Sequence, residues 1–541
     1  MKTFYRMAAA LAATVANAAI EEHLVTSLPG YDGELPSKHY SGYLPVGKTS
    51  GVPGYIHYWY IESESDPTND PLVYWTNGGP GGSGINAGLL TEMGQMHVND
   101  ASFPEDGDNS TGLKVFYNPY SWSQVANTVY VSQPKGVGFS YCADSVAESD
   151  CVNDDQTAAQ DAYDFFVAFF EGYPELKPND FYLTAESYGG IYIPTFMREI
   201  DERGGVDNFK GAAIGDGCWG TDVGLCAFGT GKSNEIQANF FNGHSMIPPT
   251  LFATLSSECT NSSSGEWYDD NVAPTECRKA LEEMSIAAGT YDVYNVYDTC
   301  GAGDRSPAPP SMRTLREWRA ALFEDKKTVT VGRLADAGPH PQLNNNQAAV
   351  SRTSESSESS EATATFSTSG SSSSSGGGGR RAARALAAVN DYPCGGDRAA
   401  SAWLGQEDVA AALHVNLTMA SKGMTYIWGP SEFSGDLRPL YAELLQKYRM
   451  MIYSGDTDAC VPFWGTEQWV RELGLPVKEP WHQWVSPLEA GGSPQRAGYA
   501  IDYDANDFKF VTVQGAGHMV PTYKPYFALT LITKFLNNES F

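Results

Sequence analysis

The chain has 541 residues, enough for one large α/β domain with an insertion or for two domains. Its 35 lysines and arginines stand against 65 aspartates and glutamates, a formal net charge of −30 that argues against nucleic acid or an anionic membrane as the main partner. Two explanations of the high acidic content are equally good: it keeps the protein soluble, or the protein works in an acidic compartment.

Residues 1–19 have the pattern of a secretory signal peptide. Lys2 and Arg6 precede an apolar run from Met7 to Val15, and Ala16-Asn17-Ala18 supplies the small residues of a cleavage site. No later apolar stretch has the length of a membrane span. We therefore expect entry into the secretory pathway, ending outside the cell or in a vacuole or lysosome. Four N-glycosylation sequons agree with this route, at Asn109, Asn261, Asn416 and Asn538.

Over residues 20–215, apolar segments typical of strands alternate with segments of helical periodicity. This part is expected to form the first part of an α/β core. Strands are expected over 40–45, 55–61, 71–76, 128–132, 181–184 and 209–215. The helical period of apolar residues over 156–171 predicts a helix. This alternation predicts an α/β fold with a mostly parallel central sheet covered by helices on both faces.

The pattern changes over 216–393, where cysteines concentrate and the strand–helix alternation fades, so this part is interpreted as an inserted cap. Within it, the low-complexity residues 344–385 are too polar to order themselves and predict a disordered surface loop. Arg380-Arg381 in this loop is either a processing site or a solvated charge pair. The second part of the core is expected over 394–541, with strands at 450–455 and 508–513 and a last helix at 523–537.

A strand-to-helix turn at Ser187 is the centre of the functional prediction. Ala185-Glu186-Ser187-Tyr188-Gly189 follows a buried strand and nearly matches G-x-S-x-G, the nucleophile elbow that lifts one hydroxyl above a sheet. Ala185 replaces the first glycine, where a small side chain is the main need. Taken alone, the segment is equally compatible with an ordinary serine in a Gly-rich turn.

Two further residues complete a candidate catalytic triad. Asp458 and His518 each follow an expected strand, and the order Ser187, Asp458, His518 is that of the α/β-hydrolases. His518 would take the serine proton, and Asp458 would hold the imidazole in the required tautomer. Singly, His518 is more often a structural histidine and Asp458 a turn residue; their joint occurrence in this order favours catalysis.

Acyl transfer also needs hydrogen-bond donors for the developing oxyanion. An elbow supplies the N–H after the nucleophile, here that of Tyr188. A second donor is expected from Gly78 or Gly79 in the loop Asn77-Gly-Gly-Pro-Gly-Gly-Ser83, which follows a buried strand. The alternative for this loop is a tight turn, although two Gly-Gly pairs exceed what a turn requires.

Four segments together resemble the serine carboxypeptidase family: WTNGGPGGS at 75–83, AESYGG at 185–190, YSGDTDACVP at 453–462 and GAGHMVP at 515–521. The similarity extends over most of residues 22–340 and 390–541. The resemblance implies an α/β-hydrolase fold, the triad Ser187, Asp458 and His518, and an oxyanion hole made by the N–H groups of Gly79 and Tyr188.

The resemblance also implies a site for the substrate's C-terminal carboxylate, formed by Asn77, Glu92 and Glu186. Its physical logic is that two carboxylates forced together cannot both stay ionised, so one pKa rises and a proton is shared. A protonated glutamate can donate to a substrate carboxylate, whereas an ionised one repels it. Exopeptidase activity at acid pH follows from this arrangement.

The cysteines depart from the family pattern. Gly82 stands where the family has a cysteine that bridges to the position of Cys394, so the resemblance leaves Cys394 to another partner, for which we predict Cys300. Short spacing suggests the local pairs Cys142–Cys151, Cys218–Cys226 and Cys259–Cys277, although sequence does not fix connectivity. Cys460 would then be the free thiol. Gly215-Asp216-Gly217 also replaces the usual Gly-Asn-Gly of the family.

The preferred interpretation is a serine-type carboxypeptidase that releases C-terminal residues at acid pH through an acyl-enzyme. It would act on peptides or proteins with a free C-terminus, as a monomer or homodimer, without metal or other cofactor. The alternatives are an acyltransferase of the carboxypeptidase-like branch, with an alcohol or amine acceptor in place of water, and a non-catalytic relative. The carboxylate-binding residues argue against the first alternative, and the intact triad argues against the second.

Overall fold

The computed structural model describes residues 21–104, 112–147, 150–220, 230–300, 328–331, 392–420, 424–427, 435–487 and 494–541. Several sequence predictions lie outside these residues: the signal peptide 1–19, the sequon at Asn109, the loop 344–385 with its dibasic pair, and Cys226. Of the other sequons, Asn416 and Asn538 are exposed and Asn261 is half-buried. None of the helices in the described ranges is both long and apolar enough to cross a bilayer.

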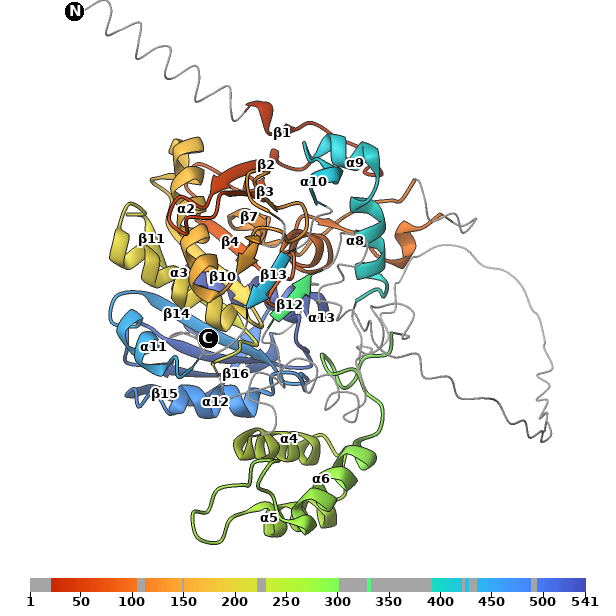
Figure 1. Cartoon of the computed structure of the whole chain (residues 1–541), viewed down its shortest axis with the longest axis vertical. Helices are drawn as coiled ribbons and strands as arrows, with labels where there is room; N and C mark the ends of the chain where they lie inside the picture. Colours follow the sequence, from red (N-terminus) through yellow and green to blue (C-terminus); the bar gives the residue numbers. More distant parts are fainter. Residues whose placement is uncertain are drawn as a thin grey trace, which may run out of the picture.

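A twelve-stranded sheet forms the centre of the molecule (Figure 1), in the order β1-β2-β3-β7-β4-β10-β11-β14-β17-β16-β15, with β8 paired to β3. Its strands are β1 (Leu24–Val25), β2 (His39–Val46), β3 (Gly54–Ile61), β4 (Leu72–Thr76), β7 (Asn127–Ser132), β8 (Tyr141–Cys142), β10 (Phe181–Glu186), β11 (Phe209–Gly215), β14 (Arg449–Gly455), β15 (Val477–Ser486), β16 (Gln495–Tyr503) and β17 (Lys509–Val513).

The sheet is parallel in its middle and antiparallel at both edges. The neighbours β7, β4, β10, β11, β14 and β17 run parallel, whereas β1, β2 and β3 on one side and β16 and β15 on the other pair antiparallel. The expected mostly parallel sheet is therefore a mixed one with a parallel centre. The hairpin of β15 and β16 was not predicted, because β15 is exposed along most of its length and contains Pro480.

Helices cover both faces of the sheet because successive strand residues point to opposite sides. On one face, Tyr74 and Leu183 pack with α2 (Asp155–Gly172) and α3 (Gly189–Arg203). On the other, Trp75 and Tyr182 pack with the π-helical segment η1 (Ile85–Glu92), α8 (Gly396–Leu404) and α14 (Pro525–Leu536). Each face thus has its own buried cluster, as an α/β layer arrangement requires.

Segments inserted between β11 and β14 lie beside this core. Helices α4 (Gly231–Gly243), α5 (Pro249–Cys259) and α6 (Thr275–Ala288) gather at one end of the molecule (Figure 1). The strands β12 (Thr328–Val331) and β13 (Met424–Ile427) join β9 (Val152–Asn153) in a small separate sheet. The remaining elements are β5 (Met96–His97), β6 (Phe116–Tyr117), the short helices η2 (Asp100–Ser102), η3 (Trp122–Gln124) and η5 (Pro174–Leu176), α9 (Glu407–Ala412), α10 (Leu417–Ala420), α11 (Arg438–Leu444), α12 (Phe463–Arg471) and α13 (Val520–Tyr523).

Three disulfides join described cysteines: Cys142–Cys151, Cys259–Cys277 and Cys300–Cys394. The second joins the last residue of α5 to α6, and the third closes a separation of 94 residues. Each is a pairing expected from the sequence. Cys226, the expected partner of Cys218, falls in an undescribed range, and Cys460 is a buried free thiol.

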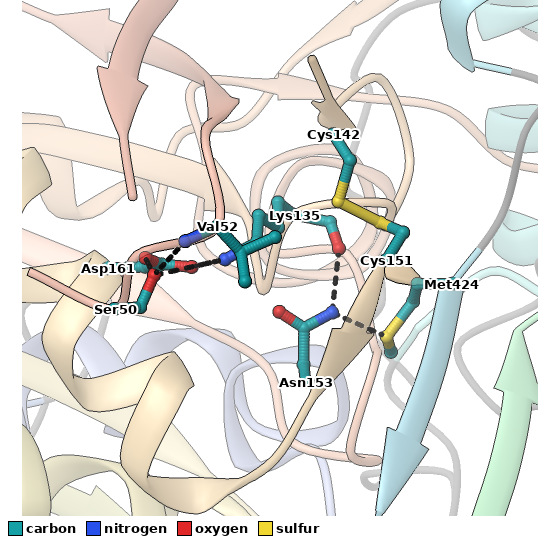
Figure 2. Close-up of a disulfide and its surroundings, with 8 residues drawn as sticks. All are labelled: Ser50, Val52, Lys135, Cys142, Cys151, Asn153, Asp161 and Met424. Atoms are coloured by element: carbon teal, nitrogen blue, oxygen red, sulfur yellow. Dashed lines mark hydrogen bonds and ion pairs between the residues drawn. A yellow bond between two sulfur atoms is a disulfide. The ribbon is translucent and has the colours of Figure 1, made fainter. Parts of the chain in front are cut away.

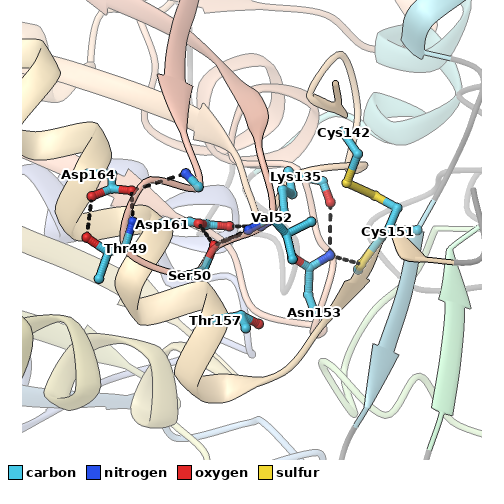
Figure 3. A network of polar contacts seen from close by, with 12 residues as sticks. Thr49, Ser50, Val52, Lys135, Cys142, Cys151, Asn153, Thr157, Asp161 and Asp164 are labelled. Atoms are coloured by element: carbon cyan, nitrogen blue, oxygen red, sulfur yellow. Dashed lines mark hydrogen bonds and ion pairs between the residues drawn. A yellow bond between two sulfur atoms is a disulfide. The ribbon is translucent and has the colours of Figure 1, made fainter. Parts of the chain in front are cut away.

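A buried ion pair anchors α2 to the loop after β7. Lys135 Nζ contacts Asp161 Oδ2, and both side chains are fully buried. Ser50 Oγ donates to the other carboxylate oxygen at 2.7 Å (Figure 2). The network in Figure 3 continues from Lys135, whose carbonyl accepts a hydrogen bond from Asn153 Nδ2 at 3.0 Å, close to the Cys142–Cys151 bridge. These contacts fix the N-terminal half of α2.

Candidate active site

Ser187 lies in a sharp turn between β10, which ends at Glu186, and α3, which begins at Gly189. Its φ is 60°, a left-handed value that is rare for a residue with a Cβ and marks a strained backbone. A Cβ added to Gly189 would lie only 2.4 Å from the Cβ of Ala185, so the turn needs glycine there and tolerates no large residue at 185. The segment therefore has the form of a nucleophile elbow.

The three triad candidates come from strands that run parallel near one another in the sheet. Ser187 follows β10, Asp458 follows β14 and His518 follows β17, in the local order β10-β11-β14-β17. Parallel strands present their carboxyl ends at one edge, which is where ligands bind in open α/β sheets. The sheet order therefore brings residues 187, 458 and 518 to the same edge.

Asp458 and His518 form a buried pair. The Nδ1 atom of His518 lies 2.7 Å from Asp458 Oδ2, and both side chains are almost completely inaccessible. The backbone N–H groups of Cys460 and Val461 donate to the two carboxylate oxygens at 2.7 and 3.1 Å. These two bonds fix the carboxylate, which in turn fixes the orientation of the imidazole.

The other imidazole nitrogen of His518, Nε2, is buried and accepts or donates no hydrogen bond within the described part of the chain. The hydroxyl of Ser187 is thus not bonded to it in this structure. Catalytic hydrogen bonds in free enzymes are often long and shorten only when substrate binds. An unpaired Nε2 beside a fixed Nδ1 is the arrangement a general base needs.

The Gly-rich loop at 77–83 packs against the elbow. A Cβ added to Gly78 would lie 2.3 Å from the backbone nitrogen of Tyr188 and 2.8 Å from Ser187 Cβ. Only glycine at position 78 allows such an approach, so the loop lies directly against the turn that carries Ser187. This contact is compatible with the expected oxyanion donors, the N–H groups of Gly79 and Tyr188, which stay a prediction.

Asn77 connects the two glutamates singled out from the sequence. Its Nδ2 donates to Glu92 Oε1 at 2.8 Å and to Glu186 Oε1 at 2.7 Å. Its Oδ1 accepts hydrogen bonds from Trp75 Nε1 at 2.7 Å and from the Gly88 amide at 3.1 Å, which fixes the amide orientation. The two carboxyl groups are therefore held together, and one of them belongs to Glu186, the residue directly before Ser187.

Burial is the main cause that raises the pKa of Glu92 and of Glu186 above the usual range for a carboxyl. For Glu186, the neighbouring Glu92 raises the pKa further. The Oε2 atoms of both residues are buried and have no hydrogen-bond partner in the described ranges other than each other's carboxyl. One proton shared by the two groups accounts for both observations.

Two residues near the elbow, Asp155 and Tyr426, were not predicted from the sequence. The hydroxyls of Tyr188 and Tyr426 both donate to Asp155 Oδ1 at 2.7 Å, where α2 begins. Asp155 and Tyr426 are remote in sequence from the elbow, and only their place in the fold brings them to Tyr188. The acidic residues at the start of this helix are visible in the sequence, but residues of this type are equally expected there as helix caps.

One group of described residues has donor atoms close enough for a metal ion: Asp458, Cys460 and His518, within 4.8 Å of one another. Asp458 and His518 already bind each other, and Asp458 also accepts two amide hydrogen bonds. These donors are occupied by the arrangement a triad requires, so we assign no metal here.

Comparison with known proteins identifies the family. The sequence model for serine carboxypeptidases matches residues 29–538. The chain belongs to the serine carboxypeptidase family. Serine carboxypeptidase-like 20 of Arabidopsis thaliana is 32% identical over 540 residues, covering 97% of this chain and 95% of the relative. Serine carboxypeptidase 1 of Hordeum vulgare is 30% identical, over 95% of this chain and 92% of the relative. The lysosomal protective protein of Mus musculus is 29% identical, over 97% of this chain and 95% of the relative.

A solved structure supports the fold of this member of the serine carboxypeptidase family. A prohormone-processing carboxypeptidase from Saccharomyces cerevisiae superposes with a TM-score of 0.58 and 17% identity, covering 96% of both chains. At 17% identity this similarity shows the fold and nothing about the activity. The fold is the α/β-hydrolase fold expected from the sequence.

Proposed function

We propose that this protein is a serine-type carboxypeptidase, which releases amino acids one at a time from the C-terminus of peptides and proteins at acid pH. The observation that carries the proposal is that the Asn77 amide donates hydrogen bonds to both Glu92 and Glu186. Glu186 is the residue directly before Ser187. A site that holds a peptide's terminal carboxylate next to the reacting bond restricts cleavage to the last residue.

In the proposed reaction, Ser187 Oγ attacks the last peptide carbonyl while His518 takes its proton. The tetrahedral oxyanion receives hydrogen bonds from the N–H groups of Gly79 and Tyr188. Collapse breaks the C–N bond, and His518 gives the proton to the leaving amino group. Water, deprotonated by His518, then attacks the ester and releases the shortened peptide, restoring the Ser187 hydroxyl. Asp458 stabilises the imidazolium in both halves.

The terminal carboxylate would bind to Asn77, Glu92 and Glu186. Two ionised glutamates would repel it, but the shared proton leaves a donor that can bond to an anion. The raised pKa of both groups keeps that proton bound over the acid range. This explains on physical grounds why an exopeptidase of this kind works in acid.

The direct test uses a blocked dipeptide with a free C-terminus and the matching dipeptide amide. At about pH 5 the free acid should lose its terminal residue and the amide should react far more slowly, because only the acid has a carboxylate for the site. Equal rates for the two substrates, or no release from the free acid, would exclude the proposal. Ser187→Ala serves as the inactive control.

The same triad would also serve an acyltransferase, in which an alcohol or amine replaces water. Adding such an acceptor at millimolar concentration to the free-acid assay separates the two reactions by product analysis. Transfer product in place of hydrolysis product, at equal substrate consumption, would favour the acyltransferase. The carboxylate site favours hydrolysis, since a transfer reaction does not need to hold a free C-terminus.

An acid compartment of the secretory route is the proposed location. The disulfides suit an oxidising environment, and the relative from Mus musculus is named as lysosomal. Fractionation of cells that express a tagged full-length chain would test this. Recovery of the protein from the cytosol would contradict the proposal.

A further inference from the structure

Asp216 occupies a strained position between two parts of the triad. It follows β11, the strand that lies between β10 and β14, and its φ of 41° is left-handed. The side chain is fully buried. Its Oδ1 accepts hydrogen bonds from Ser454 Oγ at 2.8 Å and from the Gly455 amide at 3.0 Å, and Oδ2 lies 3.2 Å from the same amide.

The backbone of the same turn holds the elbow. The carbonyl of Gly215 accepts a hydrogen bond from the Ser187 amide at 3.0 Å. The amide of Cys218 donates to the Ser187 carbonyl at 2.8 Å. The turn 215–218 therefore holds the nucleophile's backbone from both sides, while the Asp216 side chain holds the end of β14. Asp458 comes only three residues after Gly455.

We propose that Asp216 is a positioning residue, which joins the Ser187 elbow to the strand end that carries Asp458 and does so as a neutral, protonated carboxylic acid. The proposal rests on the proposed function only in that Ser187 and Asp458 act in one reaction. It gives a role to the aspartate that stands where the family usually has asparagine.

The surroundings of Asp216 disfavour an ionised carboxylate. Within the described residues, no Lys, Arg or His forms an ion pair with it, and all its hydrogen-bond donors are neutral. Burial raises its pKa well above the usual range, and the carboxylates of Asp458 and Glu186 raise it further. Tyr453 and Cys460 also interact with it electrostatically, and neither of them supplies a positive charge.

A protonated aspartate keeps one carbonyl oxygen as acceptor, as an asparagine does. The Oδ1 of either residue can therefore serve Ser454 and Gly455. An ionised aspartate would add a buried negative charge beside Asp458, which is costly without a cation. Asp216→Asn is thus the conservative variant and Asp216→Ala the disruptive one.

The positioning role is tested by the rate at which a fluorophosphonate probe labels Ser187. In this reaction the Oγ–P bond forms, fluoride leaves and His518 takes the proton, so the rate reports the geometry of elbow and base without any peptide. Asp216→Ala should be labelled about tenfold more slowly than wild type or slower still, because small displacements of the reacting groups strongly reduce the rate. Asp216→Asn should stay within about threefold.

Circular dichroism establishes that each variant is folded, and Asp436→Ala, at an exposed carboxyl that binds Arg438, is the matched control. A folded Asp216→Ala that labels at the wild-type rate would overturn the positioning role. If the alanine variant does not fold, Asp216→Ser replaces it, with the same expectation. Failure of the proposed function has a different signature: normal labelling of wild type without release of C-terminal residues.

The protonation state is tested by thermal melting of Asp216→Asn and wild type across pH. The folded pKa of Asp216 lies above the unfolded value, so wild type loses stability as pH rises above the unfolded pKa of about 3.9. The asparagine variant does not titrate at this position and escapes this loss. The Tm of the variant minus that of wild type should therefore increase by about 1 °C for each pH unit above that point. A Tm difference that does not change with pH would show an ionised Asp216 and overturn this part.

Discussion

Glu92 and Glu186 are held side by side by one amide group, because Asn77 Nδ2 donates to an oxygen of each, at 2.8 and 2.7 Å. The two residues come from different parts of the fold, the end of η1 and the end of β10. Both carboxyls are buried, so their charges are poorly screened. Their protonation is therefore a joint property, and the pH dependence of substrate binding should reflect it.

Binding of free-acid substrates should weaken as pH rises through the raised pKa of the glutamate pair. Below it, the shared proton is present and donates to the substrate carboxylate; above it, the proton is lost and the site repels the substrate. We expect kcat/KM for a free-acid peptide to fall about tenfold per pH unit on the alkaline side. An ester of a blocked amino acid, which has no terminal carboxylate, should lack this limb. Parallel profiles for acid and ester would refute the shared proton.

Replacing Glu186 by glutamine separates the shared proton from the shape of the site. Glu186→Gln keeps an oxygen for Asn77 Nδ2 but cannot share a proton with Glu92. At acid pH, kcat/KM should fall about tenfold for a free-acid peptide, the worth of one charge-assisted hydrogen bond. The ester should be hydrolysed at nearly the wild-type rate. Equal losses on both substrates would mean that the residue acts on the triad, not on the carboxylate.

Ser187→Ala should lower kcat by at least about 10⁴-fold and leave the fold intact, because only one hydroxyl is removed from the turn. His518→Ala should cost a similar factor, and the double variant little more, since nucleophile and base act as one unit. Steady-state kinetics with matched circular dichroism spectra provides the measurement. Additive losses in the double variant would indicate that the two residues work independently.

Asp458→Asn tests the orientation of the imidazole. The asparagine would retain an oxygen for one of the two amides that fix the side chain, those of Cys460 and Val461, but could not hold the required tautomer of His518. We expect kcat to fall by about 10⁴-fold at unchanged KM. A loss confined to KM would place Asp458 in substrate binding.

The parallel centre of the sheet was predictable because each of its strands is a short apolar run followed by a helix or a Gly-rich loop. The location of Ser187, Asp458 and His518 at one edge of the sheet was predictable because each of them follows such a strand. The family and the fold, as the comparisons show, follow from the same motifs. These features are local in sequence, and local patterns are what sequence reasoning detects.

Features that depend on contacts between remote segments were not predictable. The hairpin β15–β16 has few buried residues on β15 and so gives little hydrophobic signal. The bonds from Tyr188 and Tyr426 to Asp155 join residues up to 271 positions apart. The pairing of buried Lys135 with Asp161 could not be inferred either, since a lysine in a loop and an aspartate in a helix are usually solvated.

That ion pair leads to a prediction on stability. Asp161→Ala should lower the free energy of unfolding by about 3–5 kcal/mol, because it leaves the Lys135 ammonium buried without its partner. The double variant Lys135→Met, Asp161→Leu should recover most of this loss, since two apolar side chains need no partner. Asp201→Ala is the control, because the Lys447–Asp201 pair is solvent-accessible and should contribute at most about 1 kcal/mol. Denaturant unfolding followed by fluorescence measures all three. If the double variant proved as unstable as Asp161→Ala, the loss would come from packing around α2, and the uncompensated charge would not be its cause.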